Sequence, residues 1–302
     1  MTKIAFIGLG HMGGGMAANQ VKAGRQVFAY DLSAEALEKA RAHGCAPAAS
    51  VVEAVRNAEV VITMLPAGQH VRDVYLKEVL PYAPKGALLI DCSTVDVESA
   101  RAVAEVAAAT NFRFADAPVS GGIMAADAGT LTFMVGCATE DYAAVEAALQ
   151  PMAKVTIHAG TAGAGQAAKI CNNMVLGVTM LGVCEAFALA EKLGLDPERF
   201  FNIASQSSGQ CWSMSTYCPW PQVGPASPAD RGYEGGFLTG LMLKDLKLAQ
   251  EAAAKAGAST PMGAQAEALY ALFDRLGYGR KDFSAVLQML RGNLAGLAGE
   301  PA

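Results

Sequence analysis

Three polar residues recur at helical spacing near the start of an otherwise apolar segment, residues 166–192. On a helix, Gln166, Lys169 and Asn173 would share one face. Burying a lysine is costly unless its amine has a partner or a task. A desolvated lysine, whose ammonium form is disfavoured, could take the proton from a hydroxyl group while hydride leaves the adjoining carbon. The spacing alone leaves two interpretations open: a catalytic base, or a lysine that reaches solvent at a domain edge.

Two further clusters could face a negatively charged ligand. Ser120, Gly121 and Gly122 follow the apolar run 112–115. Their successive backbone N–H groups and one hydroxyl would form a concavity suited to a carboxylate, although a plain glycine turn is the alternative. Lys244 and Asp245 lie in a predicted helix, 241–256, whose other side is apolar. Taken alone, these two charges indicate an exposed helix face.

A dinucleotide-binding pattern opens the chain, where a short apolar run leads into G-x-G-x-x-G. Gly8 permits the tight turn, Gly10 lets the backbone approach a pyrophosphate, and Gly13 lets the following helix pack close to the sheet. That helix would direct its N-terminal N–H groups at the phosphates. Asp31 ends the second apolar run and can accept hydrogen bonds from the ribose hydroxyls. The next residues, 32–34, include no arginine to receive a 2′-phosphate, and Arg41 falls on the next predicted helix, so we expect NAD rather than NADP.

The elements that must position these residues are short strands and helices in alternation. Near-continuous Val/Ile/Leu runs between helical patterns predict a parallel sheet covered on both faces, with ligands beyond the carboxyl ends of its strands. Leu65, Pro66 and Thr94 follow two such strands and would lie beside the cofactor, although a turn or a helix cap is the alternative. The predicted strands are 3–7, 26–30, 60–65, 88–91, 112–115, 131–135 and 155–158.

A glycine-rich segment, 160–165, is predicted to link this sheet to a mainly helical remainder. The expected fold is therefore α/β: a Rossmann-type dinucleotide-binding domain, 1–162, followed by an all-α C-terminal domain, 163–302. A long interdomain helix at about 164–193 would join them. The other predicted helices are 197–206, 241–256, 262–277 and 281–291.

Composition limits the function classes. The 302 residues are 52% hydrophobic and 17% charged, which is typical of a globular protein. A net charge of -5 offers no basic footprint for nucleic acid. We expect no membrane span, since no apolar run approaches the roughly eighteen residues needed, and no signal segment, since the chain starts with a strand. Seven scattered cysteines without C-x-x-C and four unclustered histidines predict free thiols, no metal site and a cytoplasmic protein.

Four segments, in this order, resemble the β-hydroxyacid dehydrogenase family: Gly8–Gly13, Asp116–Gly122, Gly163–Asn173 and Leu243–Leu246. The resemblance covers nearly the whole chain. It implies that Lys169 is the catalytic lysine and that Lys244 lies over the active site, near both cofactor and substrate carboxylate. By the same resemblance, the substrate-binding residues are Ser120, Gly121, Gly122, Asn173, Lys244 and Asp245. The cofactor-binding residues are Gly8, Leu9, Gly10, His11, Met12, Gly13, Asp31, Leu65, Pro66, Thr94 and Lys244.

The resemblance implies NAD-dependent oxidation of a short 3-hydroxy acid to its semialdehyde. Residues 207–213, with Tyr217 and Trp220, are most similar to the branch that converts 3-hydroxyisobutyrate to methylmalonate semialdehyde in valine degradation. Tartronate semialdehyde or glyoxylate reduction, and oxidation of serine or 4-hydroxybutyrate, are alternatives. A dinucleotide-sensing protein without chemistry is another, whereas the imine reductases lack the lysine. The partner expected is a small carboxylate, and the apolar linking helix favours a homodimer or homotetramer.

Overall fold

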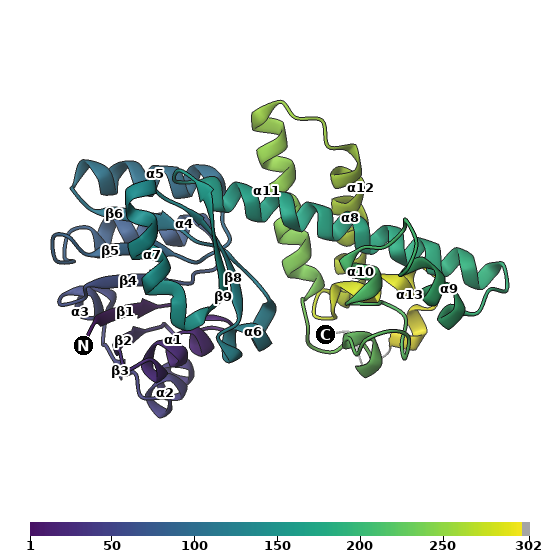
Figure 1. Cartoon of the computed structure of the whole chain (residues 1–302), viewed down its shortest axis with the longest axis horizontal. Helices are drawn as coiled ribbons and strands as arrows, with labels where there is room; N and C mark the ends of the chain where they lie inside the picture. The colour runs from purple at the N-terminus through teal and green to yellow at the C-terminus, as the bar shows by residue number, and fades with distance from the viewer. Residues whose placement is uncertain (298–302) are drawn as a thin grey trace. The chain divides into compact units, whose positions relative to one another are not determined.

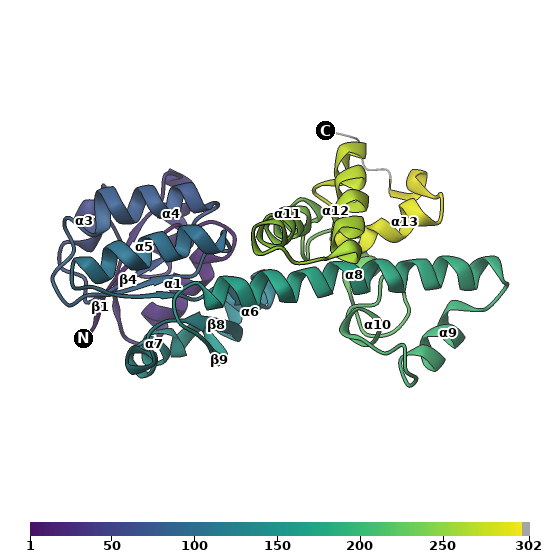
Figure 2. The same ribbon diagram turned by 90° about the horizontal axis from the view of Figure 1, so that it is seen from above.

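The computed structural model describes residues 1–297. The chain forms two compact units, Met1–Lys169 and a second that begins at Ile170 (Figure 1). The division falls inside helix α8, Ala164–Lys192, which is one continuous helix (Figure 2). The predicted domain boundary, between residues 162 and 163, lies just ahead of this helix.

The first unit is built on a nine-stranded sheet in the order β3-β2-β1-β4-β5-β6-β8-β7, with β9 beside β8. Strands β1 to β6 run parallel, as predicted, whereas β8 runs antiparallel to both β6 and β7. The strands are β1 (Lys3–Ile7), β2 (Gln26–Tyr30), β3 (Ala46–Pro47), β4 (Val60–Thr63), β5 (Leu88–Asp91), β6 (Arg113–Asp116), β7 (Val119–Ser120), β8 (Leu131–Gly136) and β9 (Ala153–Gly160).

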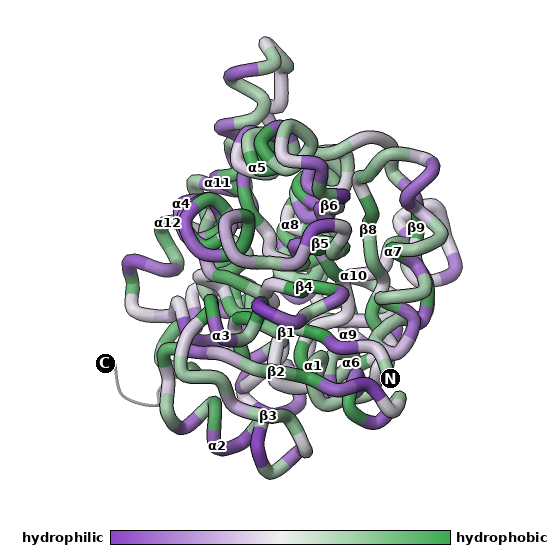
Figure 3. Tube along the Cα trace, turned by 90° about the vertical axis from the view of Figure 1, so that its left-hand side faces the viewer, coloured by the Kyte–Doolittle hydropathy of each residue, from purple (hydrophilic) through white to green (hydrophobic). Residues whose placement is uncertain are grey.

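Helices cover both faces of this sheet because its buried strands are apolar on both sides. In β1, Ile4 and Phe6 belong to the core shared with α1, α2, α6 and α7, whereas Ala5 and Ile7 belong to the core shared with α3, α4 and α5. Figure 3 shows α3, α4 and α5 on one side of the strands and α1, α6 and α7 on the other. These helices are α1 (Gly13–Lys22), α2 (Ala34–Ala42), α3 (Val51–Val55), α4 (Gly68–Val74), α5 (Val97–Ala109), α6 (Gly122–Ala128) and α7 (Tyr142–Leu149).

The second unit is helical, and across its described residues, 170–297, β structure is limited to one bridge between Leu238 and Asp282. The helix predicted at 262–277 is wrong at its end, since α12 stops at Phe273 and a wider turn contains Gly277 at φ 95°. The helix predicted at 281–291 is shorter, with α13 preceded by a single tight turn. The helices are α9 (Pro197–Ala204), α10 (Trp212–Ser215), α11 (Thr239–Ala256), α12 (Pro261–Phe273) and α13 (Val286–Leu290).

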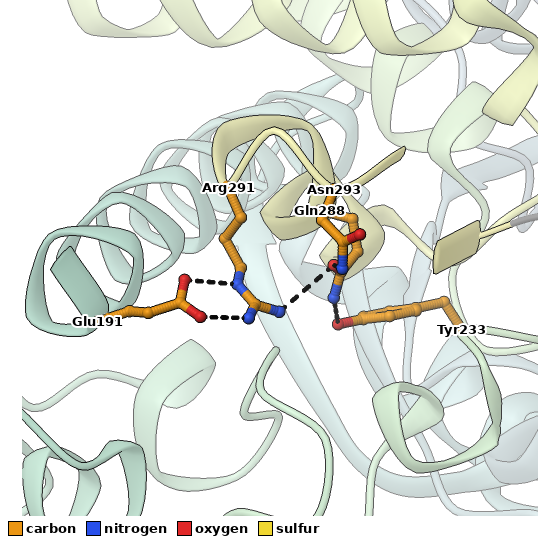
Figure 4. A network of polar contacts seen from close by, with 5 residues as sticks. All are labelled: Glu191, Tyr233, Gln288, Arg291 and Asn293. Carbon is orange, nitrogen blue, oxygen red and sulfur yellow. Dashed lines mark hydrogen bonds and ion pairs between the residues drawn. The ribbon is translucent and has the colours of Figure 1, made fainter. Parts of the chain in front are cut away.

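A polar cluster centred on Arg291 ties the end of α13 to the end of α8 (Figure 4). The Arg291 guanidinium donates to both carboxylate oxygens of Glu191, with Nε to Oε2 at 2.9 Å. It also lies over the Trp220 ring, 4.1 Å from its centroid. Beside it, Gln288 Nε2 donates to the Tyr233 hydroxyl at 2.8 Å. A bidentate, stacked guanidinium of this kind fixes geometry as well as charge.

Helix α8 also meets the length and composition of a membrane span, with a mean hydropathy of 1.7, contrary to the expectation that no segment would. The helix is apolar because it contributes to the core of the second unit. Met180, Cys184 and Phe187 are buried there against other helices. Core helices can satisfy the same criterion of length and composition, and α8 is in part such a helix, with 44% of its most apolar window buried.

Candidate active site

The three glycines of the turn after β1 differ in how much space surrounds them, which distinguishes those that the fold requires from the one that a ligand would require. Gly8 has φ +92°, and a Cβ there would lie 2.2 Å from the Met64 carbonyl oxygen. A Cβ at Gly13 would lie 2.0 Å from the Gly8 carbonyl oxygen. At Gly10, in contrast, a Cβ would meet nothing within 4 Å. The chain's own packing thus requires two of the three glycines, and the third leaves open the space that a pyrophosphate would approach.

Asp31 has a structural task in addition to the predicted one. Its Oδ2 accepts the Leu9 N–H at 2.6 Å and its Oδ1 accepts the Ser33 N–H at 2.7 Å, so it ties the glycine turn to the end of β2. The side chain stays half-buried, and each oxygen keeps lone-pair capacity for ribose hydroxyls. In the same turn, His11 is exposed and Met12 packs against the core.

The carboxyl ends of β4 and β5 bring three more of the predicted cofactor residues, Leu65, Pro66 and Thr94, to the same edge. The Leu65 N–H donates to Ser93 Oγ at 2.8 Å, and Leu65 Cδ2 lies 3.2 Å from where a Gly8 Cβ would be. Pro66 follows, exposed, and Thr94 is half-buried directly after Ser93. The residues of this edge that lie within the first unit fit a dinucleotide: a turn open at Gly10, an acid at Asp31 and a rim of loop residues.

The predicted carboxylate cradle lies where β7 ends. Gly121 has φ +134° and Gly122 has φ +70°, so both adopt left-handed backbone that favours glycine. A Cβ at Gly121 would lie 2.6 Å from Ala125 Cβ, whereas one at Gly122 would meet nothing within 4 Å. The turn leads directly into α6, a helix that the sequence pattern missed, and Ser120 is half-buried at its start.

The polar face of α8 is buried. Gln166 is 0%, Lys169 7% and Asn173 2% exposed, so a lysine that reaches solvent does not fit. Within the second unit, Asn173 Nδ2 donates to Asp245 Oδ2 at 2.5 Å. The structure thereby brings Asn173 and Asp245 together, and Lys244 is the half-buried neighbour of Asp245 on α11.

Sequence reasoning gave no role to two buried acids at strand ends. Asp91 Oδ1 accepts hydrogen bonds from the hydroxyls of Thr63 (2.7 Å) and Ser93 (2.5 Å). Asp116 accepts backbone N–H groups from the start of α8, and burial raises the pKa of its carboxyl to about 6. An acid that closes an apolar strand is the signal that could have identified both, because burial without hydrogen-bond partners would be costly.

A large cavity of the first unit lies at the opposite edge of the sheet, with a volume of about 790 Å³. Two of the basic side chains that line it donate hydrogen bonds to carbonyl oxygens at helix ends. Arg25 donates to the carbonyl oxygens of Ala147 and Ala148 at the end of α7, and Lys85 donates to that of Thr110 after α5. Cations are favoured at helix C-termini, so these contacts account for much of the positive charge there.

Fold and site together define a two-domain dehydrogenase that binds a nicotinamide dinucleotide. Residues 3–160 match the family model described as the NAD binding domain of 6-phosphogluconate dehydrogenase. Residues 163–290 match the one described as NAD-binding of NADP-dependent 3-hydroxyisobutyrate dehydrogenase. The chain belongs to the β-hydroxyacid dehydrogenase family. The predicted family, fold class and NAD-dependent enzyme class are confirmed.

Relatives in this family span nearly the whole chain. The chain is 48% identical to 3-hydroxyisobutyrate dehydrogenase of Pseudomonas aeruginosa, over 97% of this chain and 99% of that one. It is 46% identical to NAD-dependent L-serine dehydrogenase of the same organism, over 96% and 98%. A solved structure of Mycobacterium tuberculosis 3-hydroxyisobutyrate dehydrogenase with L-serine has a TM-score of 0.93, at 48% identity over 96% of this chain and 99% of that one.

Proposed function

We propose that this chain oxidises 3-hydroxyisobutyrate to methylmalonate semialdehyde with NAD. The observation that carries the proposal is a buried lysine, Lys169, one helical turn from Asn173, in a chain 48% identical to an enzyme named for this substrate. Bound NAD supplies the hydride acceptor. Lys169 takes the hydroxyl proton as the alcohol becomes a carbonyl, so the charge that develops on oxygen is removed in the same step.

The other residues bind and orient. The Ser120 hydroxyl and the N–H groups of the two glycines after it would hold the substrate carboxylate, with Lys244 supplying a positive charge. Asn173, held by Asp245, would orient the substrate. The dinucleotide would be held by Gly8, Leu9, Gly10, His11, Met12, Gly13, Asp31, Leu65, Pro66, Thr94 and Lys244.

L-Serine is the second candidate substrate, because the chain is 46% identical to a protein named for its oxidation. Both molecules carry a hydroxyl on the carbon β to a carboxylate, so the same residues could act on either. A kinetic panel decides between them. It compares kcat/KM for both 3-hydroxyisobutyrate enantiomers, L-serine, glycerate and 4-hydroxybutyrate, each with NAD and with NADP. Higher kcat/KM for L-serine would reassign the substrate, and a preference for NADP would overturn the role given to Asp31.

Replacing Lys169 with Ala tests the assignment of the base. We expect turnover to fall by about 10²–10⁴-fold, the usual contribution of a positioned general base, with the Kd for NAD changed little. Lys192→Ala is the matched control, since Lys192 is an exposed lysine at the other end of the same helix. Near wild-type turnover in Lys169→Ala would refute the assignment, whatever the preferred acid.

The proposal extends to cellular context. A 3-hydroxyisobutyrate dehydrogenase would act in valine degradation, and we propose that it does so in the cytoplasm as a homodimer or homotetramer. Apolar side chains on α8, Val175 at 59% and Leu189 at 60% exposed, support an oligomer. Light scattering coupled to gel filtration measures the mass directly, and a monomer at micromolar concentration would contradict it.

A further inference from the structure

The Gln166 side chain clamps the loop that follows β5. It is 0% exposed, its Oε1 accepts the Val95 N–H at 3.0 Å, and its Nε2 donates to the Ser93 carbonyl oxygen at 2.8 Å. The two hydrogen bonds lie on either side of Thr94. The carboxamide thus supplies one acceptor and one donor to the loop backbone, as the peptide groups of a neighbouring strand would. Gln166 is therefore bound to the cofactor edge and is not available to a substrate.

The backbone of the same residue is also held. Asp116 Oδ2 accepts the Gln166 N–H at 2.8 Å, and Oδ1 accepts the Gly163 N–H at 2.6 Å. Gly165 makes this close approach possible, because a Cβ there would lie 2.4 Å from the Met134 carbonyl oxygen and 2.8 Å from Asp116 Oδ2. The first turn of α8 is thus fixed on the ends of β6 and β8.

These contacts continue to the glycine turn. Ser93, whose carbonyl receives the Gln166 amide, also accepts the Leu65 N–H through its hydroxyl, and Leu65 packs beside Gly8. Lys169 is three residues beyond Gln166 on α8, on the same face of the helix. One connected set of contacts therefore runs from the cofactor turn, past Thr94, to the turn of helix that carries the lysine.

We propose that Gln166 is a positioning residue, which fixes Lys169 relative to Thr94 and the cofactor edge. The inference rests on the proposed function, because it assigns Lys169 to proton removal and Thr94 to the nicotinamide side. Proton removal and hydride departure must be aligned in one geometry, and a misplacement of about 1 Å can cost about 100-fold in rate. Gln166 touches neither substrate nor cofactor and acts only through the residues that it holds.

The variant Gln166→Met tests the clamp, because Met has nearly the same shape but neither hydrogen bond. Gln20→Met is the matched control. Gln20 is also 0% exposed in the first unit and donates to the Ala148 carbonyl oxygen at 3.0 Å, at the other edge of the sheet. We expect faster amide hydrogen exchange in peptides covering 92–97 and 163–170 for Gln166→Met only. Unchanged exchange there would overturn the clamp, and this result does not depend on any activity.

The kinetic measurement tests positioning with the preferred acid and its deuterated form. For Gln166→Met we expect kcat to fall by about 10–100-fold, KM and the Kd for NAD to change less than about threefold, and the deuterium isotope effect on kcat to rise. A merely structural role would lower the active fraction and leave the isotope effect unchanged, as we expect for Gln20→Met. If Gln166→Met does not fold, Gln166→Glu is the second variant. It keeps the acceptor for the Val95 N–H but loses the donor to the Ser93 carbonyl oxygen, so its isotope effect on kcat should also rise above that of the wild type.

The two proposals fail in different ways. A wild-type chain that oxidises none of the acids would overturn the proposed function, and the exchange experiment would still decide whether the clamp exists. An active wild type with faster exchange but an unchanged isotope effect in Gln166→Met would overturn positioning alone.

Discussion

Gly10 and Gly13 lie in one turn but are constrained by different neighbours, which gives a paired prediction. A Cβ at Gly13 would lie 2.0 Å from a backbone oxygen, so Gly13→Ala should lower the free energy of unfolding by about 1–3 kcal/mol. Gly10→Ala should unfold at the wild-type temperature but bind NAD at least about tenfold more weakly, since its methyl group enters the pyrophosphate space. Calorimetry measures the stability of each variant, and titration measures its affinity for NAD. An equal loss of stability in the two variants would contradict the different roles given to Gly10 and Gly13.

Asp116 predicts a pH dependence of stability. Burial raises its pKa from 3.8 to about 6 in the folded chain, so the folded state holds the proton more tightly. The contribution of the Asp116 carboxyl to the free energy of unfolding is therefore largest below about pH 4, and it is lost as the pH rises through 6. Relative to Asp116→Asn, wild type should lose about 2 kcal/mol between pH 4 and 7, measured by urea unfolding.

Asp96 provides a control of opposite sign for that measurement. Burial alone would raise its pKa, but hydrogen bonds from the Ser99 hydroxyl and N–H outweigh it and lower the pKa. Wild type should therefore gain stability relative to Asp96→Asn as the pH rises from 3 to 5. If the stability difference between wild type and variant changed with pH in the same direction for Asp116→Asn and Asp96→Asn, Asp116 would not be the cause of the predicted loss.

At the scale of elements, the Arg291 cluster predicts a loss of stability in the second unit. Arg291→Met removes the bidentate contact with Glu191 and leaves that carboxylate unpaired, so the free energy of unfolding should fall by about 1–3 kcal/mol. Arg41→Met is the control: its contact with Glu38 is exposed, and such pairs contribute less than about 1 kcal/mol. Urea unfolding measures both variants, and an equal loss of unfolding free energy in Arg291→Met and Arg41→Met would show that the cluster does not stabilise the second unit.

The elements that the sequence predicted well are those with a long, regular pattern. Strands β1, β4 and β5 are runs of apolar residues, and α8 and α11 keep helical spacing over many turns. The two-residue strands β3 and β7 are too short to show any periodicity, and α6 starts at glycine, a poor helix former. The antiparallel direction of β8 was also not predicted, because a short apolar run does not show which way its strand pairs with a neighbour.

Of the candidate site, local spacing identified the glycine turn, Asp31 and the polar face of α8, since each depends on residues close in sequence. The clamp was not predictable in this way. Asp116 lies 47 and 50 residues from the amides that it accepts, and Gln166 lies 71 and 73 residues from the loop that it holds. Partners at such separations are set by the sheet topology, which no local pattern in the sequence reveals.

At the scale of the whole molecule, residues 160–165, the predicted glycine-rich link, pack closely against the first unit. Gly165 packs directly on the sheet and Gly163 packs on Val97 and Arg101 of α5, while Asp116 accepts the backbone N–H groups at the helix start. A family boundary at residues 160–163 therefore does not coincide with the division of contacts, which falls after Lys169.

This close packing decides where the chain can be cut. A recombinant fragment ending at 162 would lack both the amides that Asp116 accepts and the carboxamide that holds the loop around Thr94. One ending at 169 keeps all of them. We expect the longer piece to melt at least about 5 °C higher and to retain NAD binding, and equal melting temperatures would contradict this. Grafting this nucleotide-binding module onto another protein would then require seven residues that belong, by family description, to the next domain.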